Sequence, residues 1–148
     1  MHWDALKGKK LVVVDASVIL KWVLPEEQEE NVLEALSLRD AIVAETVSGL
    51  VPALWYFEVG NIVSRVFPAD DADDTLNDLR ALGLIEVPIG KSMQNQALLE
   101  VNQCKVTFYD AIYRAIYTAA VTTLQSECVL ITADEQYRRK IAARLLNL

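Results

Sequence analysis

The chain has 148 residues, of which 53% are hydrophobic and 24% are charged, values typical of one globular domain, expected to span residues 1–148. Its 14 basic and 21 acidic side chains give a net charge of −7, which excludes global attraction to nucleic acid or an anionic membrane. The single histidine, His2, excludes Ser-His-Asp triads, Cys-His dyads and histidine-rich zinc sites.

The cysteines and the N-terminal segment indicate the cellular compartment. Cys104 and Cys128 have no metal-binding or redox spacing, and we interpret them as buried thiols in a reducing cytosol. Lysines precede the first apolar stretch, but Asp15 and Lys21 interrupt it and no cleavage site follows. The sequence contains no run of about 18 apolar residues that is free of charges, so we expect no membrane-spanning segment. We expect a cytoplasmic protein.

Short apolar runs alternate with helical patterns along the chain. In chain order the patterns predict strand 11–14, helices 18–23 and 27–43, strand 49–51, helices 53–67 and 70–82, strand 84–87, helices 92–104 and 108–124, strand 129–132 and helix 134–146. The first and last of these strands are continuously apolar, as expected for parallel strands that are covered on both faces. The order predicts a three-layer α/β/α sandwich with a short, mostly parallel sheet.

Two acids follow predicted strands. Asp15 comes directly after 11–14, and Asp134 follows 129–132 after one residue. Ligands of parallel α/β sheets gather at the carboxyl ends of the strands, so the two carboxylates are candidates for a site. Helix capping is the alternative: Asp15 or Ser17 could cap the next helix, and Asp134 fits a capping box that begins at Thr132.

Two further acids lie inside strongly apolar helical segments. Glu58 stands within 54–63 and Asp110 within 108–113, where an acid is costly unless it is paired or binds a metal. Ordinary ion pairs with Arg65 and Arg114, respectively, are the alternative. Asn61 shares a helix face with Glu58 because it follows three residues later.

A carboxylate cluster without histidine favours a hard divalent cation such as Mg²⁺ or Mn²⁺. Such a cation would activate water for phosphodiester hydrolysis and let an acidic protein hold an anionic substrate. Gly60 lies inside the same helix as Glu58, and we interpret it as permitting close helix packing.

The sequence resembles the PIN-domain family and, within it, the VapC-type toxin ribonucleases of toxin–antitoxin pairs. The matching segments occur in the family's order and span nearly the whole chain: Leu11–Ser17, Pro52–Asn61, Tyr109–Tyr113 and Leu130–Asp134.

The resemblance implies a PIN-like sandwich and an acidic metal site with supporting polar residues. The implied catalytic and metal-binding acids are Asp15, Glu58, Asp110 and Asp134, and the supporting residues are Ser17, Asn61 and Thr132. The resemblance also implies an RNA substrate, often a structured RNA such as tRNA, a homodimer, and inhibition by a cognate VapB-type antitoxin.

The leading hypothesis is therefore a Mg²⁺- or Mn²⁺-dependent endoribonuclease. Asp15 and Asp110 are the first-choice direct ligands, and Glu58 and Asp134 act through water, on a second metal or as a general base. A phosphatase or phosphoacceptor site is weaker, since a haloacid-dehalogenase-like site needs an acid where Ser17 stands. A non-catalytic protein-binding module with a degenerate site would bind no metal and would lose no function when Asp15 is neutralised.

Overall fold

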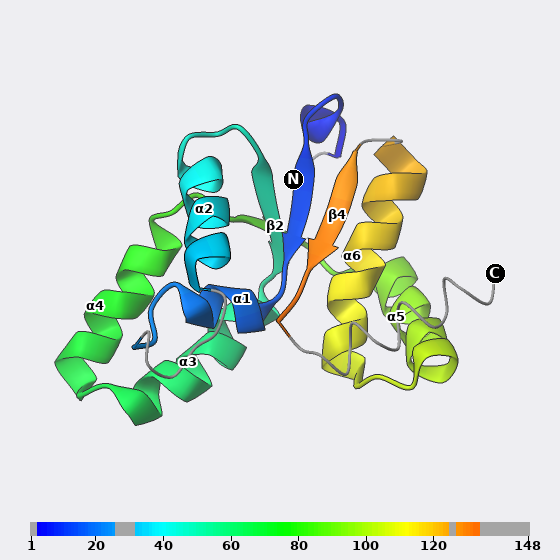
Figure 1. Cartoon of the computed structure of the whole chain (residues 1–148). Coiled ribbons are helices and arrows are strands. Elements are labelled where there is room, and N and C mark those ends of the chain that lie inside the picture. The colour runs from blue at the N-terminus through cyan, green and yellow to red at the C-terminus, as the bar shows by residue number, and fades with distance from the viewer. Residues whose placement is uncertain (1–2, 26–31, 125–126, 134–148) are drawn as a thin grey trace.

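A parallel β-sheet forms the centre of the molecule (Figure 1). The structure is a computed structural model that describes residues 3–25, 32–124 and 127–133. Its strands are β1 (Leu11–Val14), β2 (Ser48–Pro52), β3 (Ile85–Val87) and β4 (Cys128–Ile131). The strands are arranged in the order β3-β2-β1-β4, and each neighbouring pair is parallel. The carboxyl ends of all four strands therefore lie along one edge of the sheet.

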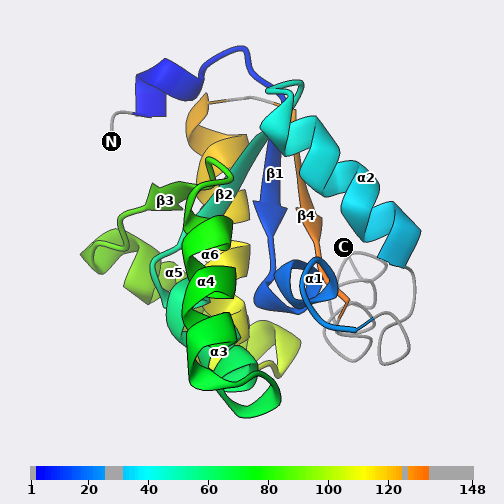
Figure 2. The same cartoon turned by 90° about the vertical axis from the view of Figure 1, so that its left-hand side faces the viewer.

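Helices cover both faces of the sheet, as Figures 1 and 2 show. On one side lie α1 (Ala16–Lys21), α2 (Val32–Val43), α3 (Leu54–Val66) and α4 (Ala69–Arg80), and on the other lie α5 (Lys91–Cys104) and α6 (Phe108–Leu124). A 3-10 helix, Trp3–Leu6, precedes β1. The expected α/β/α sandwich is confirmed. Within the described part of the chain, no helix has the length and apolarity to span a bilayer.

The main core is built around β1, the second strand from one edge of the sheet. Val13 and Val14 are fully buried, and so is Ile116 of α6. The helix α6 packs across β1, β2 and β4. Helices therefore cover both faces of this strand, which explains its unbroken apolar sequence. Cys104 and Cys128 are both buried thiols, as the sequence predicted.

The predicted elements are confirmed within the described residues, with ends that shift by one or two residues. The helix predicted at 18–23 begins instead at Ala16, because Asp15 caps it, and the strand predicted at 129–132 begins at Cys128. The 3-10 helix Trp3–Leu6 was not predicted. The helix at 134–146 and the first residues of 27–43 lie outside the described residues.

The interpretation of Gly60 as a packing glycine was wrong. Among the described residues, a Cβ atom added at Gly60 would meet only the Cδ1 atom of Leu76 on α4, at 3.8 Å. That distance is an ordinary van der Waals contact. The space beside α3 therefore accommodates a methyl group, and close packing does not require glycine.

Candidate functional site

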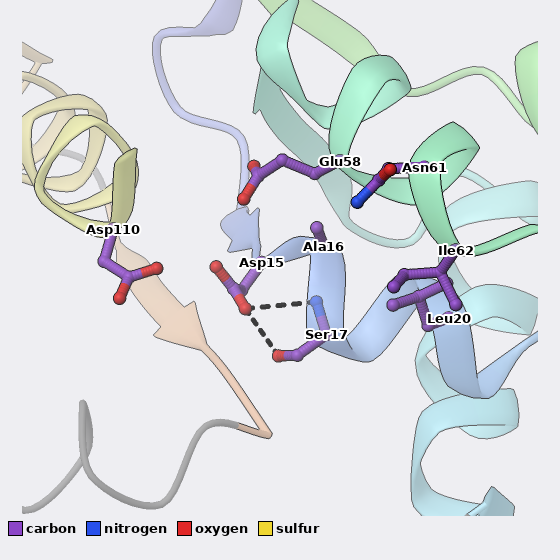
Figure 3. Close-up of a pocket in the computed structure, with 8 residues that line it drawn as sticks. All are labelled: Asp15, Ala16, Ser17, Leu20, Glu58, Asn61, Ile62 and Asp110. Carbon is purple, nitrogen blue, oxygen red and sulfur yellow. Dashed lines mark hydrogen bonds between the residues drawn. The ribbon is translucent and has the colours of Figure 1, made fainter. Parts of the chain in front are cut away.

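A pocket lies at the carboxyl ends of the strands, where β1 passes into α1 and α6 begins (Figure 3). Its volume is about 330 Å³. Three carboxylates line the pocket, and they come from three segments that lie far apart in the sequence. The lining residues are Asp15, Ala16, Ser17, Leu20, Glu58, Asn61, Ile62 and Asp110. Figure 3 shows the carboxylates of Asp15, Glu58 and Asp110 directed toward a common space.

Asp15 is the most firmly held of the three acids. It follows β1 directly, is 5% exposed, and caps α1 by accepting a hydrogen bond from the Ser17 amide at 3.1 Å. The Ser17 hydroxyl donates to the same oxygen, Oδ2, and Thr132 Oγ1 donates to it at 3.3 Å. Ser17 Oγ in turn accepts from the Ala133 amide at 2.9 Å, which connects α1 to the end of β4. Capping and site formation are therefore compatible roles for Asp15.

Glu58 projects from α3 toward Asp15 and is partly buried. Burial raises its pKa from 4.5 to about 7, a hydrogen bond from Tyr113 opposes that rise, and the negative charges of Asp15 and Asp110 add to it. The carboxyl thus has a pKa near neutrality because it is partly withdrawn from solvent and faces other acids. A cation in the pocket would favour its charged form.

Asp110 approaches the pocket from the opposite side, in the first turn of α6. Its backbone amide donates to Thr107 Oγ1 at 3.1 Å, so Thr107 fixes the start of the helix. An acid in a first helical turn is favoured by the helix dipole. Arg114, the alternative partner for Asp110, lies with its Nε 3.8 Å from Glu100 Oε2 and its guanidinium over the Tyr117 ring.

The structure thus brings together most of the residues that the sequence singled out. Asp15, Glu58 and Asp110 share the pocket with Ser17 and Asn61, and Thr132 contacts Asp15. Asp134 lies outside the described residues. Its role as a fourth acid stays a prediction.

The donor chemistry of the pocket suits a hard divalent cation. Carboxylate oxygens are the protein ligands that Mg²⁺ and Mn²⁺ prefer. Burial raises the pKa of Glu58, and the negative charges of Asp15 and Asp110 add to that rise, so a cation would relieve repulsion among the three acids. Within the described residues, no three acidic, histidine or cysteine side chains are drawn together tightly enough to form a metal-binding group. Direct coordination of one cation by all three carboxylates would therefore need them to move closer together.

Two buried residues with hydrogen-bonded polar groups were not identified from the sequence, and only the first of them contacts the pocket acids. Tyr113, fully buried in α6, donates its hydroxyl to Glu58 Oε1 at 2.8 Å. Glu100 of α5 is only 1% exposed, and it accepts from Gln96 Nε2 at 3.0 Å and from Cys104 Sγ at 3.4 Å. The apolar neighbours of Glu100 in the sequence are the same signal that identified Glu58. The aromatic ring of Tyr113 indicated only a core position.

Comparison with known proteins gave one family. The family model described as PIN domain matches residues 12–142, which is most of the chain. No curated protein matched the sequence.

Proposed function

The chain belongs to the PIN domain family, whose members are mostly metal-dependent nucleases, and from that premise we propose that it is a Mg²⁺- or Mn²⁺-dependent endoribonuclease. The observation that carries the proposal is the convergence of Asp15, Glu58 and Asp110 on one pocket at the strand ends. Parallel α/β folds place their ligands at this edge. These three acids are among those that the sequence resemblance implies, and the match to the family covers the segments that carry them.

The proposed roles follow from how each side chain is held. Asp15 and Asp110 are direct metal ligands in this proposal. Asp15 suits that role because hydrogen bonds from Ser17 and Thr132 fix its Oδ2 atom, which leaves little orientational freedom to lose. A divalent cation bound there would lower the pKa of a bound water and offset the negative charge of the phosphodiester.

Glu58 is the proposed general base or water-mediated ligand. In the metal-free protein burial raises its pKa to about 7, and a bound cation would favour its charged form, in which the carboxylate can accept a proton. Asn61 lines the same pocket and could donate a hydrogen bond to a phosphate oxygen. Asp134 remains in the proposal on the family resemblance alone, either as a ligand through water or on a second metal.

The finer proposal is a toxin of the VapBC type, acting as a cytoplasmic homodimer on an RNA such as tRNA and inhibited by a VapB-type antitoxin. Its support is the resemblance of the four segments around the acids to VapC-type chains. Exposed aromatic side chains next to the acids are compatible with protein partners: Phe57 is 69% exposed and Tyr109 is 59% exposed.

A cleavage assay tests the proposed function. Total tRNA and a mixed single-stranded RNA are incubated with the protein in Mg²⁺, Mn²⁺ or EDTA, and Asp15→Asn is compared with the wild type. We expect discrete products that need the metal and disappear in the variant. Cleavage that survives in EDTA or in Asp15→Asn would refute the proposed site. Absence of both cleavage and metal binding would favour the alternative, a non-catalytic protein-binding module.

A further inference from the structure

Tyr113 places a hydroxyl group at the junction of the three acid-bearing segments. The side chain is fully buried and lies one helical turn after Asp110 on α6. Its hydroxyl donates to Glu58 Oε1 at 2.8 Å and accepts a hydrogen bond from the backbone amide of Ala16. Ala16 directly follows Asp15. One oxygen atom therefore connects the start of α1, the Glu58 carboxylate and the helix that carries Asp110.

Packing alone does not account for this hydroxyl. A phenylalanine would fill the same apolar space between the helix and the sheet, and a buried hydroxyl is costly unless it is hydrogen-bonded. Burial, followed by the charge of Glu58, raises the pKa of the Tyr113 hydroxyl. The group therefore keeps its proton throughout the physiological range, and it can always donate to Glu58.

The hydrogen bond matters because Glu58 has a flexible side chain. A glutamate has three rotatable bonds, and the carboxylates of Asp15 and Asp110 repel it. The bond from Tyr113 opposes that repulsion and holds Oε1 toward α6. The carboxylate therefore stays in the pocket, where Figure 3 shows it. Without the bond, the Glu58 side chain would gain access to other rotamers and to solvent.

We propose that Tyr113 is a positioning residue of the acidic site, which acts by holding the Glu58 carboxylate beside Asp15. The proposal rests on the proposed metal-dependent function and extends it to a residue that touches neither metal nor substrate. Replacing a residue that hydrogen-bonds to a metal ligand typically lowers metal affinity or activity by about 10–100-fold.

The first test compares Tyr113→Phe with a matched control, Tyr117→Phe. Tyr117 lies one turn further along α6 and is half-buried, and no hydrogen bond of its hydroxyl is found among the described residues. Calorimetric Mn²⁺ binding and RNA cleavage are measured on both variants, and thermal melting reports the integrity of the fold. We expect Mn²⁺ affinity to fall by about 10-fold or more in Tyr113→Phe and to be unchanged in Tyr117→Phe.

A double-mutant cycle with Glu58→Ala, which removes the hydrogen-bond acceptor of Tyr113, separates positioning from general structural damage. If Tyr113 acts through Glu58, Tyr113→Phe will weaken Mn²⁺ binding in the wild-type background and will add almost nothing in the Glu58→Ala background. Equal losses in the two backgrounds would overturn the proposal, since the effect would then not pass through Glu58. Unchanged Mn²⁺ binding in Tyr113→Phe would overturn it as well.

The same data distinguish failure of the inference from failure of the proposed function. A wild-type protein that binds Mn²⁺ and cleaves RNA, together with an unaffected Tyr113→Phe variant, refutes the positioning role alone. A wild-type protein that neither binds Mn²⁺ nor cleaves RNA refutes the proposed function, and the positioning role with it.

Discussion

Replacing Glu58 by glutamine is expected to stabilise the metal-free protein at alkaline pH. Burial raises the pKa of Glu58 from 4.5 to about 7, so the folded state holds this proton more tightly than the unfolded state. Stability therefore falls as the pH rises from about 4.5 to about 7, and the full penalty is present above pH 7. Glutamine keeps an oxygen that can accept from Tyr113 but carries no charge, and so removes the penalty.

The size of the effect follows from the pKa shift. A rise from 4.5 to about 7 corresponds to about 3 kcal/mol at about 1.36 kcal/mol per pKa unit. Glu58 retains contact with solvent in the pocket, and screening reduces the expected value to about 1–2 kcal/mol. At pH 5 the two proteins should differ by no more than about 0.5 kcal/mol, because most Glu58 carboxyls in the folded wild type are then protonated.

Urea denaturation in EDTA at pH 5 and pH 8 measures this difference. Glu34→Gln, which neutralises an exposed carboxylate on α2, is the matched control and should show little gain at either pH. A Glu58→Gln variant less stable than the wild type at pH 8 would refute the reasoning. So would a gain of the same size at both pH values, because the stabilisation would then not come from the charge.

Three further predictions concern the same part of the molecule. Gly60→Ala should raise the free energy of unfolding by about 0.5–1 kcal/mol, since helix propensity improves and the methyl group fits; an unchanged urea midpoint would contradict this. Ser17→Ala removes the hydroxyl that bonds Asp15 and the Ala133 amide, and should lower stability by about 1–2 kcal/mol; an unchanged melting temperature would show that the network contributes nothing. Mn²⁺ at about 100 times its Kd should stabilise the wild type by about 2.7 kcal/mol, and Asp110→Asn clearly less at the same concentration; equal shifts would place the metal elsewhere.

The sequence predicted the fold well because its strongest patterns are local. The unbroken apolar run of β1 indicated a strand covered on both faces, and the structure shows such a strand beneath α6. The ends of α6 were predicted at the residues where they lie. The start of α1 was predicted two residues late, because both Asp15 and Ser17 can cap a helix and it is Asp15 that does so.

The candidate site was only partly predictable. Glu58 and Asp110 stood out because carboxylates are costly in apolar helices, but their shared pocket depends on how α3 and α6 pack. Tyr113 gave no signal, because an aromatic residue in an apolar helix indicates core, and its hydrogen-bond partner Glu58 is 55 residues away. Glu100 carried the same signal as Glu58 and was not singled out.

A crystal structure of the protein with Mn²⁺ tests the central claim most directly, because the anomalous signal of manganese locates the ion without assumptions about the site. The account predicts a peak in the pocket, in direct contact with the carboxylates of Asp15 and Asp110, and the loss of that peak in Asp15→Asn. A peak bound elsewhere, or a pocket without manganese at saturating concentration, would contradict the claim that these acids form a metal centre.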